Sequence, residues 1–373
     1  MNDELRRVLP QIPDFEPYSP GLNIDQIRER FGLHDVIKLA SNENPLGVSP
    51  VVQKAIERFA NWAFRYAQAG TPRLSKAIAE HLGVSPARVV AGNGSDEIID
   101  LLVRIKARPG MDNIIAFRPC FSMYEVQSRL CGVEFRQADL NPDFSFPFDR
   151  LLALADENTA LCFVTTPDNP SGYAPPVAAL ADLAEALPPA CLLVVDEAYM
   201  DFAEPQADYS LLARLDEFPN LVVLRTFSKM YGMAGLRLGY GVMPPWLADY
   251  MLRVKLPFSV NILAEEAGLA ALGDEVFVQA TLDAVRSGRA ELTRELTALG
   301  CEVRPSQANF LLFDLPASAG MDAKGFFEAL LERGIIIRPL SGGYGLPSSL
   351  RVTVGDGSEN RAFLRAAREI LGG

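Results

Sequence analysis

One loop of this chain combines a lysine with several donors that suit a phosphate group. It follows the apolar run 221–224 and contains Thr226, Ser228, Lys229 and Arg237, punctuated by three glycines. Hydroxyl and guanidinium groups bind phosphate oxygens, and a lysine amine attacks carbonyl carbons. In isolation the loop is more typical of a glycine-rich turn with a solvated lysine, so the phosphate interpretation depends on what else lies nearby.

A carboxylate follows the preceding strand-like run. Residues 192–195 are apolar and lead into Asp196-Glu197-Ala198-Tyr199. In open α/β sheets ligands bind at the carboxyl ends of the strands, so Asp196 and Lys229 are expected to face one crevice. An acid and an amine on one ligand fit pyridoxal phosphate, whose ring nitrogen needs an anion and whose carbonyl needs an amine. A capping or salt-bridging role for Asp196 alone is the alternative.

A third motif suits the phosphate of such a cofactor. The run Gly92-Asn93-Gly94-Ser95-Asp96 leads from a predicted strand into a predicted helix over 96–106 with Ser95 as N-cap. The free N–H groups and positive dipole end of a helix N-terminus bind dianions. An ordinary N-cap turn explains the same residues.

The remaining pattern predicts how these motifs are positioned. Strand-like runs at 89–91, 113–117, 161–164, 192–195 and 221–224 alternate with helical patterns, which indicates an α/β fold with a mostly parallel sheet. Helices at 265–272, 275–299 and 360–371 then surround strands at 309–313 and 350–354, which predicts a second, α+β unit.

Composition narrows the classes of function. The chain has 373 residues and a net charge of −12, which favours two domains and argues against nucleic-acid or membrane partners. The acidic start lacks a secretory signal, which predicts a cytoplasmic protein. The chain has only two histidines and five widely spaced cysteines, so we expect no metal site. We expect the cysteines to be free thiols.

These motifs and their order resemble the fold type I pyridoxal-phosphate aminotransferases, in particular the branch that acts on histidinol phosphate. The resemblance covers nearly the whole chain. The residues that carry it are Pro17-Tyr18-Ser19-Pro20-Gly21, Ser41-Asn42-Glu43-Asn44-Pro45, Gly92-Asn93-Gly94-Ser95-Asp96-Glu97, Pro119-Cys120-Phe121-Ser122-Met123-Tyr124, Asn169-Pro170-Ser171-Gly172, Asp196-Glu197-Ala198-Tyr199, the Lys229 loop, and Leu350-Arg351-Val352-Thr353-Val354-Gly355. The family's fold implies a large domain with a mostly parallel seven-stranded sheet and a smaller α+β C-terminal domain, which we place as an arm at 1–35 and domains at 36–245 and 246–373.

The resemblance also implies roles for the site residues. Lys229 would link to the cofactor and carry the proton, Asp196 would pair with the ring nitrogen, and Asn169 and Tyr199 would donate to the ring oxygen. Tyr124 would stack on the ring. The phosphate would be held by Ser95, Asp96, Thr226, Ser228 and Arg237, with Tyr66 of a second subunit completing the site in a homodimer. At Tyr66 the sequence departs from the family, which usually has Arg-Tyr-Pro and an acid where Arg65-Tyr66-Ala67 stands here.

Substrate selection would fall to Arg338 and Arg351, joined by Tyr18 and Asn44. The implied reaction converts histidinol phosphate and 2-oxoglutarate to imidazole-acetol phosphate and glutamate in a ping-pong cycle, a step of histidine biosynthesis. Two arginines bind a phosphate or a carboxylate equally well, so an aromatic amino-acid aminotransferase and an amino-acid-phosphate decarboxylase of the same fold stay open. A catalytically silent homologue is disfavoured because Lys229 and Asp196 are both present, and a nicotinamide dehydrogenase because G-x-G-x-x-G is absent.

Overall fold

A seven-stranded sheet forms the centre of the larger part of the molecule. The computed structural model describes residues 8–15 and 22–372. The sheet order is β2-β8-β7-β6-β5-β3-β4, in which β8 runs antiparallel to β2 and β7 and the other pairs are parallel. The strands are β2 Val89–Gly92, β3 Asn113–Arg118, β4 Glu134–Asp139, β5 Thr159–Thr165, β6 Leu192–Asp196, β7 Leu221–Thr226 and β8 Gly239–Val242. The predicted α/β class is confirmed.

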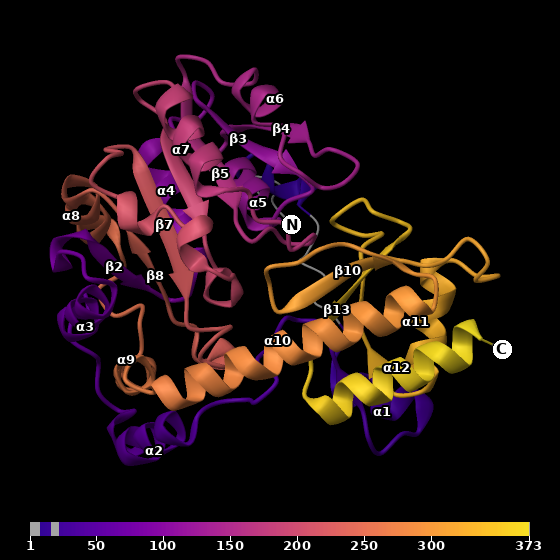
Figure 1. The fold of residues 1–373 in the computed structure, drawn as a ribbon. Helices are drawn as coiled ribbons and strands as arrows, with labels where there is room; N and C mark the ends of the chain where they lie inside the picture. Colours follow the sequence, from indigo (N-terminus) through magenta and orange to yellow (C-terminus); the bar gives the residue numbers. More distant parts are fainter. Residues whose placement is uncertain (1–7, 16–21, 373) are drawn as a thin grey trace, which may run out of the picture.

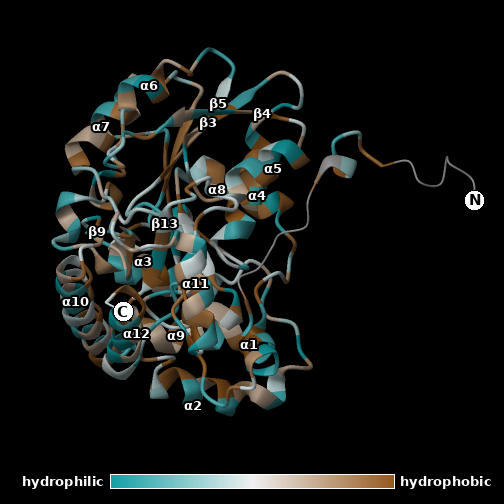
Figure 2. Ribbon diagram, turned by 90° about the vertical axis from the view of Figure 1, so that its right-hand side faces the viewer, coloured by the Kyte–Doolittle hydropathy of each residue, from teal (hydrophilic) through white to brown (hydrophobic). Residues whose placement is uncertain are grey.

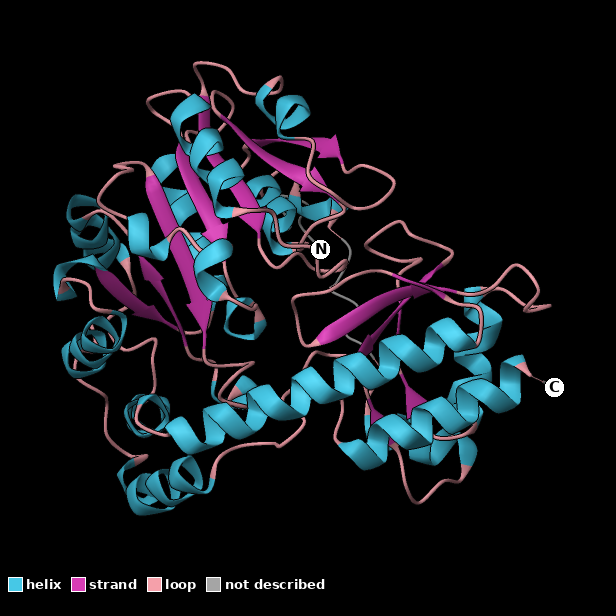
Figure 3. Cartoon of the chain, viewed as in Figure 1, coloured by secondary structure: helices cyan, strands magenta, loops and turns pink. Residues whose placement is uncertain are grey.

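Helices cover both faces of this sheet (Figures 1 and 3). One face packs against α4 (Ser95–Lys106), α5 (Met123–Leu130) and α8 (Pro245–Val254). The other packs against α2 (Pro50–Phe59), α3 (Pro72–Leu82), α7 (Val177–Ala186) and α9 (Ile262–Leu272), with the short α6 (Phe148–Leu152) beside it. Figure 2 shows the central strands in mostly hydrophobic colours, while the surrounding helices carry both kinds of residue. Because strands buried on both faces need continuous apolar runs, the sequence revealed β2, β3, β5, β6 and β7.

Two strands of the seven-stranded sheet were not predicted from the sequence, for physical reasons. Strand β4 is an edge strand whose residues are mostly half-buried or exposed, so it lacks a continuous apolar run. Strand β8 is four residues long and contains Gly239 and Gly241. A side chain at Gly239 would lie 2.4 Å from the backbone nitrogen of Ser95, so only glycine allows this strand to approach the start of α4.

A smaller unit packs beside the large one and is joined to it by the long helix α10 (Glu275–Ala298), which runs in Figure 1 from the foot of the large unit into the small one, between β10 and α12. Its sheet has the order β12-β13-β10-β9, covered by α11 (Ala323–Glu332) and α12 (Gly357–Leu371). The strands are β9 Glu302–Val303, β10 Phe310–Asp314, β12 Arg338–Pro339 and β13 Ser349–Thr353. The predicted α+β character of this region therefore matches the structure.

The domain boundaries differ from those expected. Helix α1 (Ile24–Phe31) packs against α11 residues, and β1 (Ile37–Lys38) pairs with β11 (Ile335–Ile336), so this N-terminal segment belongs to the small unit. Helices α8 and α9 lie on the large unit instead of the small one. The prediction failed here because boundaries at 36 and 246 assumed that sequence neighbours share a core, whereas the chain enters the small unit first and returns to it within α10.

Gly288 allows α10 to approach the end of β13 and the start of α12. A Cβ at this position would meet Val354 Cγ1 at 2.6 Å and Asn360 Nδ2 at 2.7 Å. We therefore expect Gly288→Ala to lower the free energy of unfolding by about 1–3 kcal/mol through overpacking. The matched control is Gly273→Ala at the end of α9, where the nearest atom is 4.0 Å away and little change is expected. Equal melting curves of the two variants would contradict this packing.

Candidate active site

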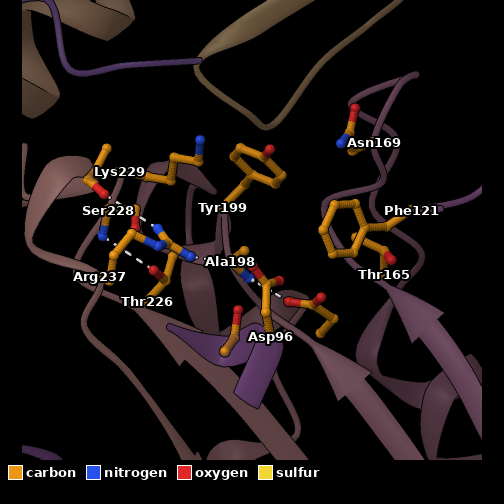
Figure 4. Close-up of a pocket in the computed structure, with 13 residues that line it drawn as sticks. Asp96, Phe121, Thr165, Asn169, Ala198, Tyr199, Thr226, Ser228, Lys229 and Arg237 are labelled. Atoms are coloured by element: carbon orange, nitrogen blue, oxygen red, sulfur yellow. Dashed lines mark hydrogen bonds and ion pairs between the residues drawn. The ribbon is translucent and has the colours of Figure 1, made fainter. Parts of the chain in front are cut away.

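A pocket lies where β5, β6 and β7 end, at the carboxyl edge of the large sheet (Figure 4). Its lining includes most of the residues singled out in the sequence. They are Ser95, Asp96, Phe121, Thr165, Asn169, Asp196, Ala198, Tyr199, Thr226, Ser228, Lys229, Ala234 and Arg237. The topology thus brings together the glycine-rich turn, the acid after β6 and the lysine loop after β7, as their positions at strand ends require.

Lys229 points its amine into this pocket beside Tyr199 (Figure 4). Its Nζ donates to the backbone oxygen of Ser41 at 3.1 Å and lies 5.6 Å from the centroid of the Tyr199 ring. Burial and the charge of Arg351 together lower the pKa of the amine to about 8, against the opposing charge of Glu43. A lysine with this pKa holds a substantial neutral fraction near neutral pH, which a nucleophile or base needs.

Asp196 forms the acidic end of the pocket. Its Oδ2 accepts from the hydroxyl of Tyr124 at 2.8 Å and its Oδ1 from the backbone N–H of Ala198 at 3.2 Å. Tyr124 is in turn 2.7 Å from Thr165 Oγ1. Burial raises the pKa of Asp196 to about 6, although the Tyr124 hydrogen bond opposes this rise. The carboxylate has no cationic partner among the described residues, so a cation placed in the pocket would stabilise its charged form.

A buried ion pair holds the two strands that carry these groups. Glu197 and Arg225 point away from the pocket and meet at 2.6 Å, and Arg225 also reaches Asp201 at 2.8 Å. Ser210 donates to both carboxylate oxygens of Glu197. Because these residues directly adjoin Asp196 and Thr226, the pair fixes the relative position of the acid and the lysine loop.

The opposite end of the pocket is suited to an anion. Helix α4 begins at Ser95 with Gly94 as N-cap and no side-chain cap, so its first N–H groups are free to bind a ligand. The prediction of Ser95 as N-cap was wrong by one residue. Arg237 lies beside this helix and meets Asp96 at 3.1 Å, while Thr226 and Ser228 line the same end.

Asn169 is oriented by the small unit. Its Oδ1 accepts from the Tyr344 hydroxyl at 3.2 Å and from Nη1 of Arg351. With the oxygen used twice, the amide nitrogen remains as the donor available to the pocket. Figure 4 shows Asn169 across the cavity from Lys229 and Tyr199.

The structure corrects the expected role of Tyr124. Its ring is fully buried and stacks on Phe163 with centroids 4.4 Å apart, and it does not line the pocket. Phe121, three residues earlier and just before α5, presents its ring to the cavity instead. Both aromatics fit the sequence motif, and only the helix start at Met123 decides which one faces the site.

Asn44 also differs from its expected role as a substrate ligand. Its amide donates to the backbone oxygens of Lys229 and Met230, at 3.2 and 2.7 Å, and its Oδ1 accepts from the backbone N–H of Leu46. The side chain is therefore occupied in holding the lysine loop. Ser41 and Asn42 belong to a motif that carries the resemblance, but the sequence predicted no role for either residue, because contacts made by a backbone oxygen or a loop amide leave no periodic signal.

The two arginines expected to bind substrate lie on neighbouring strands. Arg338 of β12 stands directly opposite Arg351 of β13. Arg351 is buried and donates to Ala40 O at 2.8 Å, and its Nε has no hydrogen-bond partner. Arg338 is half-buried and forms no ion pair with any residue in the described ranges. Like charges directly opposite each other destabilise a strand pair, so an anion between them would be stabilising.

Two further predicted residues lie elsewhere. Tyr66 is 80% exposed and stacks on Phe258 with centroids 4.6 Å apart, outside the pocket of its own chain. Tyr18 and its motif 17–21 lie outside the described residues.

Within the described part of the chain, no three His, Cys, Asp or Glu side chains are grouped to hold a metal ion, and no helix is long and apolar enough to cross a membrane.

The donor set of the pocket fits pyridoxal phosphate. The pocket offers a buried carboxylate without a cationic partner among the described residues, free helix N–H groups beside Arg237, and a lysine amine. Phe121 supplies an apolar face for a flat ring. These features match a protonated ring nitrogen, a phosphate dianion and a reactive carbonyl on one ligand.

Comparisons with known proteins agree with this chemistry. The aminotransferase class I and II family matches residues 34–366. Histidinol-phosphate aminotransferase from Nitratidesulfovibrio vulgaris (strain Hildenborough) is 65% identical over 364 residues, which cover 98% of this chain and 96% of the relative. Histidinol-phosphate aminotransferase from Anaeromyxobacter sp. (strain Fw109-5) is 41% identical over 365 residues, which cover 98% of this chain and 99% of the relative. The crystal structure of histidinol-phosphate aminotransferase from Sinorhizobium meliloti in complex with pyridoxal-5'-phosphate superposes with a TM-score of 0.88 at 27% identity, covering 98% of both chains. The chain belongs to the class I and II aminotransferases, among the histidinol-phosphate aminotransferases of that family.

The lowered pKa of Lys229 predicts its reactivity. An amine reacts with aldehydes only when neutral, so reductive methylation of Lys229 in the cofactor-free protein should rise with pH and reach half its maximum near pH 8. Mass spectrometry of the modified peptide measures this rate, with free Nα-acetyl-lysine in the same solution as the reference. A midpoint for Lys229 equal to that of the reference would contradict the burial argument.

Proposed function

We propose that the protein transfers the amino group of histidinol phosphate to 2-oxoglutarate, in two half-reactions that share one site. The observation that carries the proposal is that Lys229, Asp196 and Arg237 line a single pocket. Its amine has a pKa of about 8, and the two ends of the pocket suit opposite charges. The family membership and the 65% identical relative support the same reaction.

The cofactor of the proposed reaction is pyridoxal phosphate. When bound, it supplies a ring that accepts the electron pair released from the substrate carbon. Asp196 would hold the proton on the ring nitrogen, and Asn169 and Tyr199 would donate to the ring oxygen. The phosphate would be bound by the α4 N-terminus, Thr226, Ser228 and Arg237, and the ring face would be covered by Phe121.

Lys229 would link to the cofactor and, once displaced by the substrate amine, accept and return the proton at its Nζ. The Ser41 carbonyl, 3.1 Å away, keeps the amine directed toward the pocket during this exchange. A pKa near 8 makes both acceptance and release of the proton accessible close to neutral pH.

Arg338 and Arg351 would bind the anionic end of each substrate. They stand opposite each other on β12 and β13, where two cations without an intervening acid favour a phosphate or a carboxylate. The same pair would serve histidinol phosphate in one half-reaction and glutamate in the other. The two same-fold alternatives, an aromatic aminotransferase and an amino-acid-phosphate decarboxylase, differ from this proposal in the substrates that they consume and the products that they form.

A homodimer completes the proposed site. Large apolar side chains are exposed around Tyr66 and line one surface groove that includes Phe64 and Phe258. Exposed apolar groups of this kind are typical of subunit interfaces. Tyr66 would then contact the phosphate in the partner's site. A cytoplasmic location stays part of the prediction.

Product analysis tests the proposed reaction. Protein reconstituted with pyridoxal phosphate should form glutamate from 2-oxoglutarate when histidinol phosphate is added. Lys229→Ala should lower kcat by about 10³-fold or more, since it removes the nucleophile and the base together. Lys324→Ala, an exposed lysine on α11, is the matched control and should retain full activity. Release of carbon dioxide without consumption of 2-oxoglutarate would replace the proposal by the decarboxylase.

Mixing two inactive variants tests the dimer. If Tyr66 acts across the interface, Lys229→Ala and Tyr66→Ala chains that exchange partners form heterodimers with one intact site, and about a quarter of wild-type activity should return. If Tyr66 served its own chain, every site would lack one of the two residues and mixing would restore nothing. Sedimentation of the wild-type protein checks the oligomeric state independently.

A further inference from the structure

The hydroxyl of Tyr199 is held in a direction that serves the pocket. Tyr199 lines the cavity beside Lys229, and its ring packs edge-on against Phe310 with centroids 5.1 Å apart. Within the described residues, the hydroxyl makes one hydrogen bond to protein, with Asn42 Nδ2 at 3.1 Å. An amide nitrogen only donates, so the Tyr199 oxygen is the acceptor here.

The orientation of the Asn42 amide follows from Thr353. The backbone N–H of Asn42 donates to Thr353 Oγ1 at 2.9 Å, so the hydroxyl hydrogen of Thr353 is left to donate to Asn42 Oδ1 at 3.1 Å. With its oxygen bound to Thr353, Asn42 must present its nitrogen to Tyr199. Asn42 and Thr353 are 1% and 3% exposed, so water does not compete for these bonds.

The backbone of Asn42 is fixed as strongly as its side chain. Its φ of 53° lies in the left-handed region, which asparagine tolerates better than most residues. Its carbonyl oxygen accepts from Asn309 Nδ2 at 3.2 Å. Asn42 thus connects Thr353 and Asn309 of the small unit to a tyrosine of the large unit.

We infer that Asn42 and Thr353 are positioning residues that direct the Tyr199 proton into the pocket. Because the Tyr199 oxygen already accepts a hydrogen bond from Asn42, its own proton is free to be donated on the pocket side, to an acceptor oxygen of the bound cofactor. A donor to a phenol oxygen also strengthens that phenol as a donor. This inference rests on the proposed function, since it assumes pyridoxal phosphate as the acceptor.

The pKa of Tyr199 supports the same role for this residue as a hydrogen-bond donor. Burial raises the pKa of Tyr199 to about 12, while the Asn42 hydrogen bond and the charge of Arg351 oppose the rise. The phenol therefore stays protonated at neutral pH and acts as a donor. Replacing Asn42 by an acceptor would reverse the direction of this hydrogen bond.

The test compares the bound cofactor's visible absorption during a pH titration in several variants. Tyr199→Phe removes the donor and sets the reference shift in the titration midpoint. Asn42→Asp, which accepts the tyrosine proton, should shift the midpoint in the same direction as Tyr199→Phe. Thr353→Val, which frees the Asn42 amide to turn, should shift it by a smaller amount in that direction. Both should weaken cofactor binding about five- to tenfold, the effect of one lost hydrogen bond, measured by equilibrium dialysis.

Two controls separate orientation from general damage. Thr353→Ser keeps the hydroxyl and should titrate as wild type. Thr166→Val removes another buried hydroxyl near the site, one without a hydrogen-bond partner, and should also leave the midpoint unchanged.

Wild-type midpoints and cofactor affinity in folded Asn42→Asp and Thr353→Val proteins would overturn the inference while leaving the proposed function intact. If Asn42→Asp fails to fold, the nearly isosteric Thr353→Val decides alone. A wild-type protein without a visible cofactor band would instead overturn the proposed function, and the inference with it.

Discussion

The structure depends on how charge is buried at one edge of the large sheet. Asp196 and Arg351 are removed from water, and the amine of Lys229 is largely so. An isolated buried charge costs several kcal/mol, so each needs a partner or a ligand. Protein groups supply some of these partners: Tyr124 forms a hydrogen bond with Asp196, and Ser41 forms one with Lys229. Among the described residues, no protein group supplies a counter-charge to the Asp196 carboxylate. A ligand with a cation at one end and anions at the other would stabilise the buried charges of the pocket.

The segment Ser41–Asn44 shows how the two units cooperate around this pocket. Ser41 binds the lysine amine, Asn42 binds the Tyr199 hydroxyl, and Asn44 binds the backbone of the lysine loop. The segment precedes the large sheet in sequence, yet it is anchored by Thr353 of the small unit. Arg351, two residues earlier on the same face of β13, orients Asn169 in a similar way. One strand of the small unit therefore sets two donors of the site.

Much of this arrangement follows from the sequence because buried strands and strand ends leave clear signals. Apolar runs predicted five strands of the large sheet, and the positions of Asp196 and Lys229 after consecutive runs predicted their convergence. The stacking role assigned to Tyr124 was wrong because the aromatic that faces the pocket depends on where α5 begins. The role of Asn44 and the domain boundaries were wrong because they depend on contacts between segments hundreds of residues apart, such as Asn44 with Lys229 and Ile37 with Ile335.

The protonation state of the bound cofactor tests the central claim most directly. We would record the ¹⁵N chemical shift of ring-labelled pyridoxal phosphate bound to the wild-type protein and to Asp196→Asn between pH 6 and 9. The account predicts a ring nitrogen that stays protonated across this range in the wild type, because the buried Asp196 carboxylate pairs with it, and that loses its proton in Asp196→Asn. A ring nitrogen that is neutral at pH 7 in the wild-type protein would contradict the account.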